Sequence, residues 1–239
     1  MLVVLGASFA LASLATKPAR AASPCSREGV TLVCKRGDRD LRVVHDTLSP
    51  SGRYGFAWGF STGDWTDRTL LKDDRDGSYY ARDRSGVENY LVRLPDSEIL
   101  KRLAGSHFGD RLEYNRWDYR VRWSPNSAWV VEENDTQLTN AYHIERDDRV
   151  IGPFDLKSYC DDAAFKKAAA ELLGRQGKKI SADDSGASPL EINGVHNDGT
   201  VDVTIDFNDE QYKAKIGLAV GQNPGSLDAR LISIKPSAR

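Results

Sequence analysis

The feature that most constrains the fold is a strictly alternating aromatic segment. Residues 54–60 read YGFAWGF, so that four aromatic side chains alternate with glycine and alanine. A period of two is that of a β-strand, in which successive side chains point to opposite faces. The preceding residues 49–52 read SPSG, a turn in which proline presets φ and glycine takes the left-handed position. We therefore predict a core strand with one aromatic face and one nearly bare face that another layer can approach closely.

The same pattern returns 75 residues later. Residues 122–127 read RWSPNS and the β-rich string AWVV follows them. Each copy is trailed by an apolar strand, an acidic turn and a second apolar stretch, over residues 88–100 and 141–151. The copies differ in length mainly through a charged, glycine-rich insert at residues 63–86. The sequence therefore contains an internal repeat of two copies.

The strings LSPSGRYGFAW and RWSPNSAWVV resemble the SPDG-type hairpins of TolB-type and WD40-like β-propeller repeats in exported bacterial proteins. The resemblance covers roughly residues 41–156 and implies propeller-blade-like antiparallel sheets. A propeller usually needs four or more blades, and two copies are present here. We therefore expect a mostly β fold that does not form a complete propeller.

The composition changes after residue 156, which indicates a second unit at residues 157–239. The string AAFKKAAAELLG follows two aspartates and has apolar residues at helical spacing, so it predicts a helix with an acidic N-terminus. Apolar alternation flanks an Asn197-Asp198-Gly199 turn, and two further strand-like stretches follow at 212–220 and 227–234. One helix with about four antiparallel strands makes a small α+β unit.

The N-terminal residues indicate export. Residues 2–16 are apolar and small, and an Ala19-x-Ala21 site follows, as in a secretory signal peptide. The alternative is a buried N-terminal helix. We expect a signal peptide at residues 1–21, a β-rich region with two propeller-like repeats at 22–156, and a periplasmic or secreted location.

Three cysteines also bear on the compartment in which the protein is located. In an oxidising compartment Cys25 and Cys34 could close a small loop as a disulfide, but pairing of either with Cys160 is equally allowed by the sequence. We expect the remaining thiol to be structural, since no histidine lies beside Cys160 in the sequence.

Composition narrows the classes of partner. The chain has 33 basic and 35 acidic residues, a net charge of −2, which argues against a nucleic-acid footprint. No apolar run approaches the roughly 18 residues that span a bilayer. The histidines and cysteines show no ligand spacing, so we expect no metal site and no cofactor.

The five tryptophans fall within residues 58–129 and provide the candidate binding residues. Trp58, Trp123 and Trp129 are in phase with the repeat strands and are expected in the core. Trp65 and Trp117 lie among charged, loop-like residues, so they are candidates for stacking on a sugar or peptide ligand.

The candidates for catalysis are His107, Asp110 and Glu133. His107 and Asp110 lie three residues apart in a loop flanked by glycines, where they could act as a base and its orienting group. Glu133 follows Glu132 at a strand end, and paired carboxylates can cleave glycosidic bonds. A solvated loop or turn is the simpler interpretation of each.

The sequence thus predicts a non-enzymatic binding or accessory protein whose partner is a protein or a component of the cell envelope, with loops around Trp65, His107 and Trp117 as its site. Two alternatives remain: a hydrolase of envelope glycan or peptide using His107, Asp110 or Glu133, and a structural or assembly factor without a small ligand.

Overall fold

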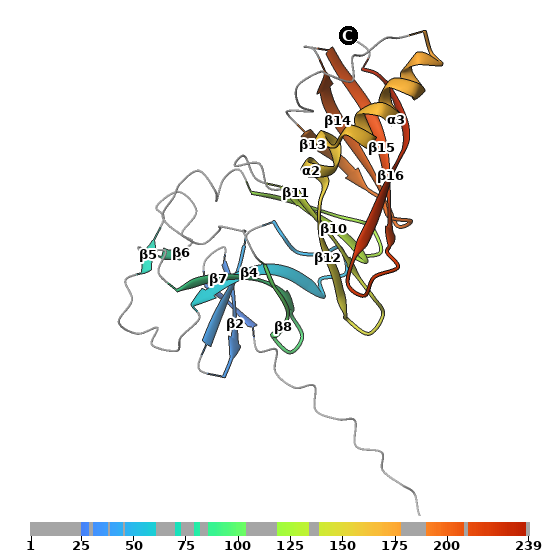
Figure 1. Cartoon of the computed structure of the whole chain (residues 1–239). Helices are drawn as coiled ribbons and strands as arrows, with labels where there is room; N and C mark the ends of the chain where they lie inside the picture. Colours follow the sequence, from blue (N-terminus) through green and yellow to red (C-terminus); the bar gives the residue numbers. More distant parts are fainter. Residues whose placement is uncertain are drawn as a thin grey trace, which may run out of the picture.

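The computed structural model describes residues 25–28, 31–37, 39–44, 46–60, 70–72, 79–81, 86–103, 119–133, 139–177, 190–207 and 210–237. The chain is mostly β, with antiparallel sheets, as the sequence predicted, and the part so described also contains two helices (Figure 1). The expected signal peptide at residues 1–21 lies outside the described residues.

The repeat region forms two sheets. The first has the order β1-β2-β3-β4-β7-β8, where these strands are Cys25–Glu28, Thr31–Arg36, Arg39–Val43, Tyr54–Phe60, Val87–Arg93 and Glu98–Leu103. The second has the order β12-β11-β10-β9, with β9 to β12 at Arg120–Trp123, Trp129–Glu133, Thr139–Ile144 and Val150–Asp155. A two-stranded pair, β5 (Leu70–Lys72) and β6 (Tyr79–Ala81), lies within the insert. The strands β3-β4-β7-β8 and β9-β10-β11-β12 are thus two four-stranded meanders with the antiparallel pattern of propeller blades.

The two repeat turns are built alike. The hydroxyl of Ser49 accepts the backbone N–H of Tyr54 at 3.0 Å, and the hydroxyl of Ser124 accepts that of Trp129 at 2.9 Å. Each serine therefore satisfies the first backbone donor of the following strand, five residues on. The 75-residue offset between the copies holds at the level of individual hydrogen bonds.

The fourth residue of each turn has a left-handed backbone. It is Gly52 in the first copy, at φ 67°, and Ser127 in the second, at φ 62°. The hydroxyl of Ser127 also accepts the backbone N–H of Ser51 at 3.1 Å, so the two turns touch each other.

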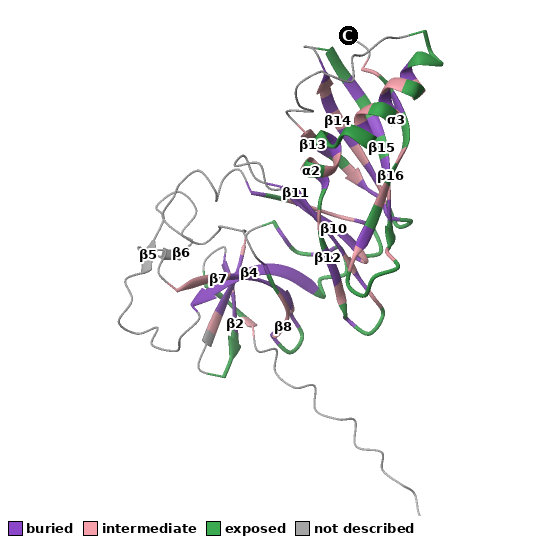
Figure 2. Cartoon of the chain, viewed as in Figure 1, coloured by how far each residue is buried: buried purple, intermediate pink, exposed green. Residues whose placement is uncertain are grey.

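The aromatic face of β4 forms the interface between the two sheets. Every residue of β4 is buried, as its colouring in Figure 2 shows, so the predicted core strand is confirmed. Phe56 makes edge-on ring contacts with Trp123 and Tyr142 of the second sheet and with Tyr119, which directly precedes β9. Burial of several aromatic side chains, each worth about 1.5–3 kcal/mol, makes this interface a main source of stability for the repeat pair.

A buried carboxylate also joins the two sheets. Asp148, in the turn after β11, accepts hydrogen bonds from the Tyr54 hydroxyl and from Nη2 of Arg53, each at 2.5 Å, and from Nη1 of Arg93. Burial alone raises the pKa of Asp148, but the bonds from Tyr54 and Arg93 and the charge of Arg53 outweigh it and hold the pKa below its ordinary 3.8.

We expect this contact to make stability depend on acid pH. Because the folded-state pKa of Asp148 is lowered, its contribution is present above the ordinary carboxyl pKa and is lost as the pH falls through the folded value. Urea unfolding of the wild type and of Asp148→Asn, at pH values from 7 to 2, measures this contribution as the gap in unfolding free energy between the two proteins. The gap in unfolding free energy should be constant from pH 7 to about 5 and shrink at lower pH; a gap unchanged down to pH 2 would contradict the assignment.

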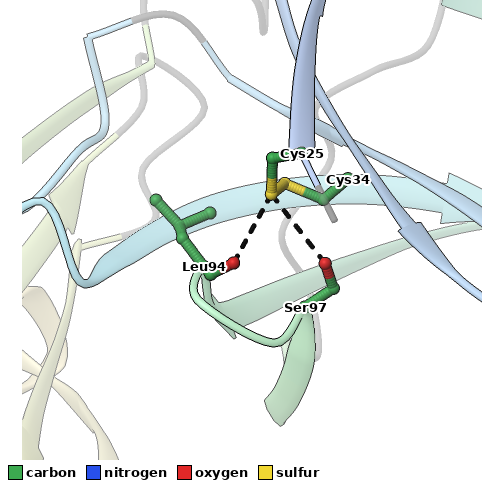
Figure 3. Close-up of a disulfide and its surroundings, with 4 residues drawn as sticks. All are labelled: Cys25, Cys34, Leu94 and Ser97. Atoms are coloured by element: carbon green, nitrogen blue, oxygen red, sulfur yellow. Dashed lines mark hydrogen bonds between the residues drawn. A yellow bond between two sulfur atoms is a disulfide. The ribbon is translucent and has the colours of Figure 1, made fainter. Parts of the chain in front are cut away.

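The opposite face of the first sheet is covered by the curling of the sheet itself. The buried residues on this side include Cys34, Leu41, Ala57 and Val92. Figure 3 shows how β1 comes round to the turn between β7 and β8. The Sγ of Cys25 lies 3.5 Å from the carbonyl oxygen of Leu94 and 3.8 Å from the hydroxyl of Ser97.

Cys25 and Cys34 form a disulfide across β1 and β2, which selects one of the three pairings that the sequence allowed. Cys160 is the free cysteine of the described residues; it is buried, and burial raises the pKa of its thiol to about 12. A thiol in that state is unreactive at neutral pH, in line with the structural role expected for it.

Reduction of the disulfide should lower the free energy of unfolding by about 2–3 kcal/mol, because it removes a short crosslink, of nine residues' separation, from the unfolded chain. Urea unfolding with and without reductant measures the effect. The double variant Cys25→Ser, Cys34→Ser is the control, since reductant should leave it unchanged. A wild-type protein indifferent to reductant would show that the crosslink adds nothing to global stability.

The C-terminal unit packs on the second sheet. Strands β13 to β16, at Leu190–Val195, Thr200–Phe207, Glu210–Val220 and Leu227–Pro236, form a four-stranded sheet in sequence order. Two helices, α2 (Leu156–Asp161) and α3 (Ala163–Gly174), lie across one of its faces (Figure 1). The expected helix corresponds to α3, which begins after its N-cap Asp162, and the short α2 was not predicted.

One hydrophobic core spans this junction. Trp129, Val131 and Ile151 of the second sheet belong to the same cluster of buried residues as Phe165 of α3 and Ile192 of β13. The two-copy repeat is therefore covered by the chain itself on both outer faces: by the curled N-terminal strands on one side and by the α+β unit on the other. Terminal caps of this kind let a short repeat array bury its faces.

Candidate functional site

Most of the residues predicted to form a site lie outside the described part of the chain. This holds for Trp65, His107, Asp110 and Trp117. Their proposed roles in binding or catalysis therefore stay predictions.

Glu133 is described and lies at the end of β10, against the edge of β13. Its Oε2 accepts the backbone N–H of Ile192 at 3.2 Å, and its Oε1 is 4.0 Å from Nη1 of Arg120 without a hydrogen bond. Burial is the main cause that raises the pKa of Glu133. The carboxylate thus accepts from a backbone N–H on the edge of the C-terminal sheet, which is a structural role.

The neighbouring Glu132 points to the opposite face of the sheet and is fully buried. It accepts hydrogen bonds from the hydroxyls of Tyr119 at 2.7 Å and Tyr142 at 2.5 Å, and from Nδ2 of Asn140 at 3.2 Å. Burial, followed by the charge of Glu132, raises the pKa of both tyrosines. This buried network lies within the interface between the two repeat sheets, so we assign it a structural role.

The repeat tryptophans largely behave as expected. Trp58 is 4% exposed and Trp129 is 7% exposed, while Trp123 is partly buried and packs against the interface between the sheets. Trp129 has a second property that the sequence did not reveal, because it also lines an open hollow at the junction with the C-terminal unit.

Trp129 and His143 form the floor of this hollow. They are opposite each other in the pairing of β10 with β11, and their ring centroids are 4.2 Å apart at an interplanar angle of 30°. The Nδ1 of His143 lies 3.1 Å from the carbonyl oxygen of Ala128, which can only accept, so Nδ1 carries the hydrogen. Burial lowers the pKa of His143, so the ring is neutral at pH 7 and Nε2 is a hydrogen-bond acceptor.

The turn between β13 and β14 forms one wall of the hollow. The Oδ1 of Asn197 accepts the backbone N–H of Asn126 at 2.9 Å, which ties this turn to the second repeat turn. Gly199 has a left-handed backbone at φ 81° and lies on the indole: a Cβ at this position would be 2.9 Å from Cζ2 of Trp129. The glycine is therefore needed both for the turn and for the close approach to Trp129.

The rim of the hollow carries both signs of charge. It is supplied by the turn between β11 and β12, where Glu145, Arg146, Asp147 and Arg149 alternate. Arg149 is paired with Glu145, whereas Arg146 is exposed and has no ion-pair partner among the described residues. The hollow has a volume of about 610 Å³, within the usual range for ligand sites.

A second hollow of about 590 Å³ adjoins the first and shares Asn197 with it. Two of its lining residues bind Asp202, which accepts a hydrogen bond from His196 Nε2 at 2.8 Å and pairs with Lys215 Nζ at 3.0 Å. The turn at residues 196–199 is thus a ridge between two open polar hollows.

Sequence reasoning missed the first hollow, the junction hollow, because its residues come from three separate turns and strands. The Asn197-Asp198-Gly199 signal predicted a hairpin turn but not its neighbour. The repeat itself is the signal that could have indicated this site. It places Trp129 at the first strand position after the turn, where the part of the chain that covers this end of the sheet must contact it.

Within the described ranges, no group of three or more His, Cys, Asp or Glu residues is arranged to hold a metal ion. No helix in this part of the chain is both long and apolar enough to cross a membrane.

No family model and no curated protein matches the sequence. Solved structures that resemble the fold include Hsv2 of Kluyveromyces marxianus, at 8% identity and a TM-score of 0.34, which covers 88% of this chain and 57% of that one. Another is Hsv2 of Kluyveromyces lactis, at 9% identity and a TM-score of 0.28; this match covers 88% of the present chain and 72% of the Kluyveromyces lactis protein. The chain spans little more than half the length of the first, and scores this low carry no argument about function. Fold and site together define a class: a mostly β protein in which two blade-like repeats and an α+β unit meet at an open polar hollow.

Proposed function

We propose that this chain is an exported, non-enzymatic binding or accessory protein whose partner is a protein or a component of the cell envelope. The observation that carries the proposal is the junction hollow, where a tryptophan and a neutral histidine form the floor of an open site rimmed by charged and amide side chains. Concave sites with an aromatic floor and a few polar groups are typical of ligand binding.

The disulfide supports the location. Disulfides such as Cys25–Cys34 persist in oxidising compartments, which include the periplasm and the cell exterior. The apolar segment at residues 2–16 and the small residues at 19–21 fit the same route.

The loops around Trp65, His107 and Trp117 remain the sequence-based candidates for further contacts with the partner. The hydrolase alternative uses His107, Asp110 or Glu133, and of these the described Glu133 is engaged with the edge of β13. The assembly-factor alternative predicts a stable protein partner and no small ligand.

A thermal-shift panel with cell-wall fragments, oligosaccharides, peptides and divalent metals tests the proposal. A ligand at 100 times its Kd stabilises a folded protein by about 2.7 kcal/mol, which moves the midpoint by several degrees. Loss of the shift in the double variant Trp65→Ala, Trp117→Ala would place the site on the predicted loops, and loss in His143→Phe would place it in the junction hollow. Turnover of the ligand would favour the hydrolase instead, and a flat panel with a co-purifying protein would favour the assembly factor.

A further inference from the structure

The floor of the junction hollow holds one hydrogen-bond donor and one acceptor that nothing in the described structure uses. The indole N–H of Trp129 can only donate, and no described residue accepts from it. The Nε2 of His143 can only accept, since Nδ1 carries the hydrogen, and no described residue donates to it. Trp129 is 7% exposed as a residue, but neither its indole nitrogen nor His143 Nε2 is among the buried side-chain atoms that lack a partner, so both atoms can be reached from solvent. Both groups can therefore bind a ligand that enters the hollow.

The surroundings hold both groups in place. The strand pairing places Trp129 opposite His143, the bond to the carbonyl of Ala128 fixes the imidazole, and Gly199 packs against the indole. Donor and acceptor are therefore preorganised, and a ligand does not have to order them when it binds.

A ligand that uses both groups must offer one acceptor and one donor. One residue of an extended peptide does so, because its C=O and its N–H point to the same edge of the chain. The rim carries two acidic and two basic side chains, which suits the mixed side chains of a peptide and disfavours a strongly charged ion of either sign. The second hollow adjoins the first at Asn197, so a chain-like ligand that crosses this residue meets a second set of polar side chains.

We propose that the junction hollow binds an extended peptide segment of a partner protein, one residue of which accepts from the Trp129 indole N–H through its C=O and donates its own N–H to His143 Nε2. This inference rests on the proposed binding function and names the partner chemistry of that site. Flanking side chains of the peptide pair with the charged rim, where Arg146 is the cation left without an ion-pair partner in the described structure.

Nuclear magnetic resonance of the disulfide-intact protein tests the proposal through the indole N–H signal of Trp129, identified by its absence in Trp129→Phe. The probes are a blocked octapeptide of alanine, lysine and glutamate, the same peptide N-methylated at its alanines, and a trimer of N-acetylglucosamine. The octapeptide should move the Trp129 signal saturably. The N-methylated peptide should bind about tenfold more weakly, as expected for loss of one hydrogen bond.

Two variants test the atoms involved. His143→Phe keeps a flat ring against the indole but removes Nε2, so octapeptide affinity should fall about tenfold. Trp129→Phe lacks the indole signal, so its affinity is read from the backbone amide signals that the octapeptide moves, and it should be weakened similarly. The matched control Trp123→Phe removes an indole N–H already bonded to the Thr47 carbonyl and should leave affinity unchanged. Equal affinity of wild type and His143→Phe, with both proteins folded, would overturn the proposed recognition.

The outcomes separate this inference from the proposed function. A response to the sugar trimer and not to the octapeptide would overturn the peptide as ligand and leave the binding function standing. A panel hit that leaves the Trp129 signal unmoved would place binding elsewhere and overturn the inference alone. A protein that binds none of the probes and no member of the panel would overturn both.

Discussion

Replacement of Glu132 by alanine is expected to lower the free energy of unfolding by about 3–5 kcal/mol, because it removes the carboxylate to which several buried groups donate. The hydroxyls of Tyr119 and Tyr142 and the amide of Asn140 all donate to this carboxylate inside the interface between the repeat sheets. Neither tyrosine can reach water without opening the aromatic core around Phe56. The loss should therefore be felt by the whole repeat region.

Urea unfolding followed by circular dichroism measures the loss. The matched control is Glu210→Ala, since Glu210 also accepts a tyrosine hydroxyl, that of Tyr212 at 2.8 Å, but is exposed. The control should lose less than about 1 kcal/mol, because water replaces the lost partner. Similar losses in the two variants would show that burial does not decide the cost, and the role assigned to Glu132 would be wrong.

The sequence predicted the elements whose signals are local. Alternation in residues 54–60 marked β4, the paired SP turns marked the repeat, and the Asn197-Asp198-Gly199 turn separated β13 from β14. Each of these signals is read within about ten residues, where backbone preference and the side-chain period act directly.

The junction hollow could not be predicted in the same way. Trp129, His143 and Asn197 meet only through the register of β10 with β11 and the packing of the C-terminal turn on that edge. A shift of one residue in register would turn His143 to the other face. Sequence patterning constrains such a register but does not state which turn of a later unit will cover it.

The carboxylates at 132 and 133 show the same limit. As neighbours in β10 they point to opposite faces, so Glu132 enters the interface between the repeats while Glu133 binds the edge of β13. The expectation that a carboxylate pair at a strand end is solvated was wrong for both side chains, since both are buried. What the sequence lacked was knowledge that each face of this strand would be covered by a different part of the chain.

Gly199→Ala is expected to lower the free energy of unfolding by about 2–4 kcal/mol, the sum of a left-handed backbone and an overpacked contact. A Cβ here would be 2.7 Å from the carbonyl oxygen of Leu218 and 2.9 Å from Cζ2 of Trp129. Gly225→Ala is the matched control: its φ of 80° is nearly the same as the 81° of Gly199, and its Cβ would meet nothing within 4 Å. The control should lose about 1–2 kcal/mol from the backbone alone.

Urea unfolding of the two glycine variants isolates the contact, because their backbone costs cancel in the difference. The excess loss in Gly199→Ala should come with a displaced indole N–H signal of Trp129, which Gly225→Ala should leave in place. Equal losses with an unmoved signal would mean that the turn yields without disturbing Trp129. In that case the turn that forms the wall of the junction hollow would move without shifting the indole. The fixed positions of the Trp129 donor and the His143 acceptor could then not be attributed to this turn.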